Sequence, residues 1–150
     1  MVAMLPVRTV TYGGSDPSWL ASAHGTLNNR SVTLDLSKFD FTASTGDFLN
    51  GMIPSGVVLG KITASGLYGP YDDSLMTGVE VATGFLFSDV DVRAHIEAAG
   101  STTLTGVKAL APMMITGIIL VSKLPTNNGL DTAGRVDLKA GSPASFQFIG

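Results

Sequence analysis

Cysteine is absent from this chain of 150 residues, and charged side chains are scarce. Without Cys there is no disulfide framework, no thiolate nucleophile and no thiolate metal ligand. Charged residues make up 14% of the sequence, against an ordinary share of about a quarter. The nine Lys and Arg residues are scattered singly and the net charge is −3. Nucleic-acid-binding surfaces cluster basic side chains, so no nucleic-acid partner is expected.

Long apolar runs are also missing. The most apolar stretch, residues 113–121, is about half of the roughly 20 residues that a membrane helix needs, so we expect a buried strand there and no membrane partner. The first residues contain Arg8 as their single basic side chain and no apolar run, so we expect no secretory signal. The mean hydropathy of +0.34 is high for a soluble monomer. It indicates burial between subunits or a core with two buried faces.

Glutamate is rare and glycine is abundant. Only two Glu occur against ten Asp, and Gly accounts for 18 residues. Helix surfaces favour Glu and Lys, whereas Asp and Gly belong to turns and caps, so little helix is expected. The composition therefore predicts short strands joined by tight turns, in a mainly β (α+β) fold.

Apolar periodicity places the strands. Val32, Leu34 and Leu36 alternate with polar residues over 31–37, which predicts a strand with one wet face, and Phe39 and Phe41 extend the alternation. Further strands are expected at 57–62, at 79–87 with a possible bulge at a glycine, at 102–110, at 113–122 and around 146–149. Residues 92–99 fit a short helix or a strand.

One convincing helix is expected, at 129–141 near the end of the sequence. Asp131 can cap it, and Leu130, Leu138 and either Ala133 or Gly134 fall near one face. Gly141 suits the left-handed position just past the helix end.

Residues 1–30 differ in sequence pattern from the rest and are interpreted as an N-terminal arm. Residues 31–150 are interpreted as a single mainly β domain. Asp16 and Pro17 predict the start of a short helix that Gly25 ends. A single turn cannot bury Trp19, so this side chain needs the main body or a partner.

Chemistry-bearing patterns are weak. Neither His24 nor His95 has a second ligand at a metal-binding spacing, and no Gly-x-Ser-x-Gly elbow occurs. The segment from Gly56 to Lys61 has three residues between its glycines where a phosphate loop has four. The pairs at 72–73 and 89–91 fit solvated turns better than a calcium loop. We therefore expect no enzyme, and no catalytic, cofactor-binding or metal-binding residues.

Two longer stretches carry a resemblance to a known family. The sequence Ile-Pro-Ser-Gly-Val-Val-Leu-Gly-Lys-Ile-Thr at 53–63, followed by Gly-Leu-Tyr-Gly-Pro-Tyr-Asp at 66–72, resembles the core signature of lambda-type head decoration proteins of tailed phages. Gly78, residues 81–86, the late helix and the terminal strand continue the likeness. Upstream, residues 15–25 and 30–34 resemble the arm of decoration proteins from actinobacterial phages. The likeness spans about residues 12–149 and is weakest at 88–105.

The resemblance implies a capsid-stabilising structural protein. Family members are homotrimers at the three-fold and quasi-three-fold positions of the expanded head, where they hold the major capsid protein lattice against internal DNA pressure. The implied fold is a compact β-barrel or β-tulip-like body with one C-terminal helix and an extended N-terminal arm. The implied location is the outer surface of the virion, with the host cytoplasm as the site of assembly.

Site residues follow from this interpretation together with the residue pattern. The arm supplies a backbone that can add a strand to a sheet edge of the capsid protein, and its aromatic and apolar side chains supply anchors. A chain lacking residues 1–25 is expected to fold without binding capsids. The expected arm residues are Val10, Thr11, Tyr12, Ser15, Asp16, Trp19, Leu20 and His24. The expected trimer-interface residues are Ile53, Met76 and Met113.

Three alternatives remain open. Trp19 could instead pack over its own barrel, because a lone Trp is so often a core residue. Tyr68 and Tyr71, beside Gly69-Pro70, could stack on sugars in a carbohydrate- or host-surface-binding β module. A small hydrolase using His24 or His95 would need a pocket with an adjacent base.

Overall fold

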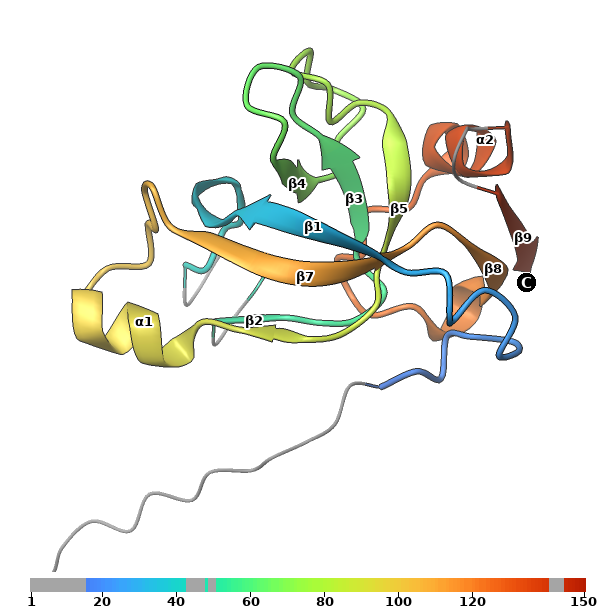
Figure 1. Ribbon diagram of the computed structural model, residues 1–150, viewed down its shortest axis with the longest axis horizontal. Coiled ribbons are helices and arrows are strands. Elements are labelled where there is room, and N and C mark those ends of the chain that lie inside the picture. The colour runs from blue at the N-terminus through green and yellow to red at the C-terminus, as the bar shows by residue number, and fades with distance from the viewer. Residues whose placement is uncertain (1–15, 43–47, 49–50, 141–144) are drawn as a thin grey trace, which may run out of the picture.

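The protein is mainly β with two helices (Figure 1), and the computed structural model describes residues 16–42, 48, 51–140 and 145–150. The strands are β1 (Arg30–Asp35), β2 (Met52–Ile53), β3 (Val58–Lys61), β4 (Tyr68–Pro70), β5 (Ala82–Leu86), β6 (Val90–Asp91), β7 (Lys108–Met114), β8 (Thr116–Leu120) and β9 (Ser145–Ile149). The helices are α1 (Arg93–Ala99) and α2 (Thr132–Ala140), with short 3-10 turns at Leu36–Lys38 and Val121–Lys123.

Five strands form the main sheet, in the order β1-β4-β3-β5-β7. The pairings are antiparallel except between β1 and β4, which meet in parallel through the single residue pair Leu34 and Tyr68. β1 also pairs with β7 along its whole length, from Arg30 opposite Met113 to Asp35 opposite Lys108. β1 and β7, the first and last strands in this order, are thus paired with each other.

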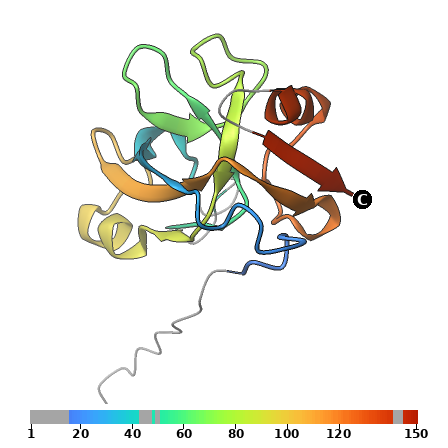
Figure 2. The same ribbon diagram turned by 45° about the vertical axis from the view of Figure 1, so that its right-hand side comes forward.

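Two smaller sheets flank the main one. β2 pairs with β6 next to α1, and β8 pairs in parallel with β9 next to α2. Figures 1 and 2 place α1 and α2 at opposite ends of the molecule. The structure therefore has an α1 end and an α2 end, with the five-stranded sheet between them.

Side chains bury on both faces of the main sheet, in two clusters. Neighbouring residues of one strand go to different clusters, as Val58 and Leu59 do on β3 and Phe85 and Leu86 do on β5. The cluster towards α2, called core B, contains Trp19, Val58, Tyr71, Ala82, Phe85, Met114, Ile119, Leu138 and Phe146. The high mean hydropathy thus has a source within one chain, since strands buried on both faces read as continuous apolar runs.

The sequence pattern predicted the position of β1 correctly but not the residue at which the strand ends. The strand alternates buried and wetter residues as predicted, but it stops at Asp35. The Asp35 carboxylate accepts a hydrogen bond from the Ser37 backbone N–H at 3.1 Å and closes a 3-10 turn. Phe39 and Phe41 are buried beyond that turn, so the predicted extension of the strand through them is wrong.

Other boundaries moved in similar ways. The strand expected at 102–110 begins only at Lys108, after a turn in which Gly106 has a φ of 75°. The ambiguous segment 92–99 is the helix α1, so the body has a second helix in addition to the C-terminal one. The pairing of β3 with β5 shifts between Leu59 and Gly60, next to Gly84, where the sequence indicated a bulge.

Helix α2 confirms the predicted C-terminal helix. Asp131 precedes it, and its carboxylate accepts the Gly134 backbone N–H at 2.7 Å, which satisfies one free donor of the first turn. Gly134 and Leu138 are the buried residues of the helix, on the predicted face. Gly141 lies outside the described residues.

Candidate functional site

The first described residues are joined to the body by backbone hydrogen bonds. The Leu120 N–H donates to the Trp19 carbonyl at 2.7 Å, and the Ala21 N–H donates to the Ile118 carbonyl at 2.9 Å. Leu20 forms an antiparallel bridge with Ile119 between these two bonds. Residues 16–21, here called the docked segment, therefore extend the small sheet on the edge of β8 that β9 does not use.

Trp19 holds the docked segment in place from inside the protein. Its side chain is 1% exposed and stacks on Phe85, with ring centroids 5.5 Å apart. The indole Nε1–H donates to the Ser55 hydroxyl at 2.8 Å. Ser55 is itself buried, and its backbone N–H donates to the Asp89 carboxylate at 2.7 Å. The one polar atom of the indole is thus satisfied in an otherwise apolar socket.

The socket depends on a glycine. Gly56 has a φ of 100°, and a Cβ at this position would lie 3.2 Å from the indole Nε1 and 2.7 Å from Pro125 Cδ. The Pro-Ser-Gly turn at 54–56 therefore supplies both the hydrogen-bond acceptor and the space for Trp19.

These contacts correct the predicted domain boundary. The chain joins the body by Trp19 and not at residue 30, and Trp19 is a core residue of its own chain, as the alternative interpretation held. Leu20 is half-buried against β8. Neither side chain is an exposed anchor. Of the other expected arm residues, Asp16 and His24 are exposed, while Val10, Thr11, Tyr12 and Ser15 lie outside the described residues.

The expected short helix after Asp16 is a turn instead. The Ser18 N–H donates to the Asp16 carboxylate at 3.0 Å, and the Leu20 N–H donates to the Pro17 carbonyl at 2.9 Å. The bonds from Ser18, first its backbone N–H and then its side chain, lower the pKa of Asp16. The next N–H, that of Ala21, goes to β8 and cannot continue a helix. Tertiary pairing overrides the local helix-start signal here.

His24 lies at a polar hollow beside β8 and β9. The hollow has a volume of about 260 Å³ and is lined by His24, Thr116, Gly117, Ile118, Ser145 and Gln147. None of these lining residues is acidic, so His24 has no carboxylate there to orient it as a base. His95 is exposed on α1, at the opposite end of the molecule (Figure 1). The two histidines therefore do not lie in one site.

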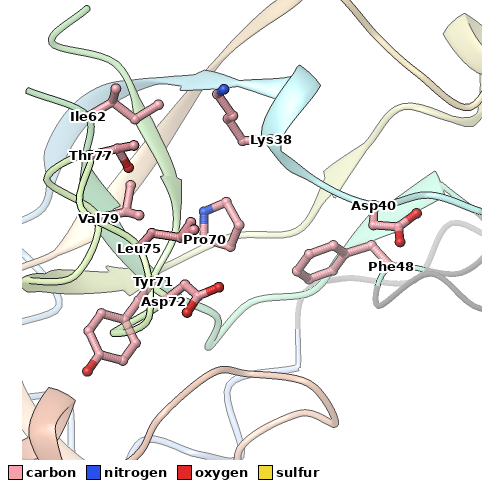
Figure 3. Close-up of a pocket in the computed structure, with 10 residues that line it drawn as sticks. All are labelled: Lys38, Asp40, Phe48, Ile62, Pro70, Tyr71, Asp72, Leu75, Thr77 and Val79. Carbon is pink, nitrogen blue, oxygen red and sulfur yellow. The ribbon is translucent and has the colours of Figure 1, made fainter. Parts of the chain in front are cut away.

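A larger, mostly apolar groove opens between the turn that follows β1 and the loop that follows β4 (Figure 3). Its volume is about 360 Å³. Figure 3 shows the Lys38 amino group at one side, with Asp40 and Phe48 at another and the Tyr71 ring directed away. The groove, here called the Lys38–Leu75 groove, is lined by Lys38, Asp40, Phe48, Ile62, Pro70, Tyr71, Asp72, Leu75, Thr77 and Val79.

The hydroxyl of Tyr71 anchors the start of α2. It donates to the Asp131 carboxylate at 2.9 Å. Burial, together with the hydrogen bond to negatively charged Asp131, raises the pKa of Tyr71. Partial burial alone would raise the pKa of Asp131, but the Gly134 N–H and the Tyr71 hydroxyl donate to its charged form and lower it overall. The charge of Asp131 in turn raises the pKa of Asp73.

Tyr71 is 5% exposed and belongs to core B, so it offers no ring face to a sugar. Tyr68 is half-buried against the other core cluster. The structure therefore removes the pair of exposed aromatics on which the carbohydrate-binding alternative was based. Sequence reasoning missed this role of Tyr71, because the residue it bonds to, Asp131, lies 60 positions further along the chain.

Two of the three expected trimer residues are core residues. Ile53 is 0% and Met113 is 2% exposed within the single chain, so neither has surface to offer to another copy. They were misassigned because core and interface have the same apolar composition. Met76 is 95% exposed, and its place at the trimer interface stays a prediction.

Metal and membrane sites are not found in the described parts of the chain. No group of three or more acidic or histidine side chains there can hold a metal ion. No described helix is long and apolar enough to cross a membrane. Neither the protein-family models nor the curated proteins with which the sequence was compared match this chain.

Two features of the described residues stand out: the docked segment and the Lys38–Leu75 groove. The first is held rigidly by Trp19, and the second combines apolar lining with exposed charges.

Proposed function

We propose that this protein is a head decoration protein of a tailed phage. It binds as a homotrimer at the three-fold and quasi-three-fold positions of the expanded head, on the outer surface of the virion. There it stabilises the major capsid protein lattice against internal DNA pressure, after assembly in the host cytoplasm. It acts as a structural protein and carries out no reaction.

The docked segment is the observation that carries this proposal. Its two backbone hydrogen bonds and the Trp19 socket fix residues 16–21 on the body, directly after the residues that we assign to the arm. An arm tethered at a rigid point keeps a high effective concentration at its target, and three arms on one trimer bind with avidity. This offsets the cost of ordering the arm, which is about 1–2 kcal/mol per residue.

Attachment is assigned to a shorter arm than the sequence indicated. With Trp19 and Leu20 committed to the body, the capsid-binding arm comprises residues 1–15, including Val10, Thr11, Tyr12 and Ser15, and ends at exposed Asp16. On the capsid, its backbone would add a strand to a sheet edge of the major capsid protein, which requires little of the side chains.

The resemblance at 53–63 and 66–72 supports the proposed body as well. These residues form β3, β4 and the turn that carries Ser55 and Gly56, so the signature coincides with the centre of the main sheet. We interpret the cyclic order of the five strands as the barrel- or tulip-like body of this class of proteins.

The test is cosedimentation with expanded empty heads that lack this protein. The full chain is expected to saturate the heads and to raise the temperature at which they open, whereas a chain lacking residues 1–15 is expected not to sediment with them. Trp19 fluorescence and circular dichroism serve as the folding control for the shortened chain. Saturation by the shortened chain would refute the arm, and no binding by the full chain would refute the decoration function.

A further inference from the structure

The sequence contains a single Asp-Pro bond, between Asp16 and Pro17, at the start of the docked segment. Both residues are exposed. The contacts that hold the docked segment on the body come from later residues, such as the Trp19 indole in its socket and the Ala21 N–H on β8. A break between Asp16 and Pro17 would therefore separate residues 1–16 from the body and leave those contacts in place.

The side chain of Asp16 is held against its own backbone. Its carboxylate accepts the Ser18 N–H at 3.0 Å, which closes a turn between the side chain and the backbone two residues on. The bonds from Ser18 lower the pKa of Asp16, and the positive charge of Lys123, in the 3-10 turn after β8, adds to this, whereas desolvation opposes it. The carboxylate therefore stays partly ionised in acid that protonates most ordinary Asp side chains.

The nitrogen of Pro17 makes this bond easier to break than other bonds that follow an Asp. It is a tertiary amide nitrogen and carries no hydrogen. Such a nitrogen takes up a proton more readily than a secondary amide nitrogen, and a protonated amine leaves easily. On the other side of the bond, the Asp16 carboxylate and the carbonyl carbon belong to one residue, so attack closes a five-membered ring. Reactions between groups held together in this way have high effective molarities.

We propose that Asp16 cleaves its own bond to Pro17 in mild acid, and so separates residues 1–16 from an intact body of residues 17–150. One carboxylate oxygen forms a bond to the Asp16 backbone carbonyl carbon, and the bond from this carbon to the Pro17 nitrogen breaks. The electron pair of the broken bond stays on the nitrogen, which takes a proton from the solvent. Asp16 is left as a cyclic anhydride, which one water molecule opens to two carboxyl groups. The net change is one hydrolysis per chain without turnover, so it is no enzymatic activity.

The test is incubation of the purified protein at pH 3.8, the ordinary pKa of Asp, followed by neutralisation and mass spectrometry. Two fragments are expected, residues 1–16 and residues 17–150. Asp16→Asn is the matched control, because its side-chain oxygen can still accept the Ser18 N–H but it supplies no carboxylate. This variant is expected to be cleaved more slowly by about tenfold or more. Cleavage of Asp16→Asn at the wild-type rate would overturn the inference.

Asp40 provides a comparison within the same chain. It is exposed, its carboxylate accepts the Thr42 N–H at 3.0 Å, and the bonds from Thr42 lower its pKa, as those from Ser18 do for Asp16. The residue after it is Phe41 and not a proline. The bond between Asp40 and Phe41 is therefore expected to survive the incubation that cleaves the chain after Asp16. Equal cleavage after both residues would contradict the role assigned to the proline nitrogen.

The state of the larger fragment tests whether the body is left intact. Purified residues 17–150 are expected, at neutral pH, to have the urea midpoint of the full chain, because the socket and the pairing with β8 remain. The fluorescence of Trp19 is expected to stay that of a buried indole. A lower midpoint, or the emission of an indole in water, would show that the break disturbs the body.

Decorated heads separate this inference from the proposed function, on which the result with heads also rests. If residues 1–15 bind the capsid, acid treatment is expected to leave the short fragment on the heads and to release residues 17–150. Asp16→Asn is expected to stay bound through the same treatment. A large fragment that still sediments with the heads would refute the arm and leave the cleavage standing. A wild-type chain that stays whole in acid would refute the cleavage and leave the proposed function as it is.

Discussion

At the scale of single residues, Trp19 carries the docking of the N-terminal segment. Trp19→Ala removes a fully enclosed aromatic side chain from core B, and is expected to lower the free energy of unfolding by about 3–5 kcal/mol. Urea unfolding followed by circular dichroism measures this. Leu27→Ala is the control, since Leu27 is 96% exposed and its loss should change stability by about 0.5 kcal/mol or less. Similar losses of unfolding free energy for both variants would contradict the burial of Trp19 in its socket.

The hydrogen bond in the socket can be isolated from the packing. Ser55→Ala leaves the indole N–H buried without an acceptor, which costs about 1–3 kcal/mol. The same change in a Trp19→Phe background is expected to cost less, because Phe has no N–H to satisfy. An equal cost in both backgrounds would show that Ser55 acts on something other than Trp19.

The bond between Tyr71 and Asp131 makes a pH-dependent contribution to stability. The pKa of Asp131 lies below 3.8 in the folded protein, so its contribution is present above the unfolded pKa and is lost as pH falls through the lower, folded value. Tyr71→Phe is expected to lower the unfolding temperature at neutral pH, with a smaller deficit below pH 3.8. Tyr68→Phe should show no such pH-dependent difference. Thermal unfolding of the three proteins across this range checks it.

At the scale of elements, β3 depends on a close approach that only glycine permits. A Cβ on Gly60 would lie 2.6 Å from the Val79 Cα and carbonyl oxygen, which are backbone atoms that cannot move aside. Gly60→Ala is therefore expected to cost about 1–3 kcal/mol or more. Its pairing partner on β4, Gly69, provides the control, because a Cβ there would meet side-chain atoms and no backbone, with Lys38 Cβ at 3.3 Å and Ile62 Cδ1 at 3.7 Å. The urea midpoints of the two variants check this, and a lower midpoint for Gly69→Ala than for Gly60→Ala would contradict it.

Elements with a local signal were predictable, and those set by distant residues were not. Alternation in β1 and the Asp131 cap of α2 each depend on neighbours in sequence. The docking of Trp19 and its bond to Ser55 depend on residues far apart, and no local pattern encodes them. Ile53 and Met113 were assigned to the trimer interface for the same reason: no local pattern distinguishes a side chain buried within its own chain from one buried against a partner, because both are apolar.

At the scale of the whole molecule, truncation separates arm from body. Removing residues 1–15 is expected to leave the free energy of unfolding nearly unchanged, since the socket and the β8 pairing are retained. Removing residues 1–25 also deletes Trp19 and the bridge between Leu20 and Ile119, and is expected to destabilise the body by about 3–5 kcal/mol or more. This replaces the expectation that the longer deletion leaves the body intact. Equal stability of the two truncated chains, by urea unfolding, would contradict it.

The central position of β8 has a consequence for the order of folding. One of its edges is closed by Leu20 and the other by β9, segments that are distant from each other along the chain. Core B likewise needs Trp19, Phe85 and Phe146 together. Contacts so far apart form slowly, because loop closure must precede the gain from packing. During synthesis, the α1 end can begin to pack before residues 145–149 have been made. The packing around the Trp19 indole can be completed only after these residues are present. Indole burial should therefore mark the last step of folding.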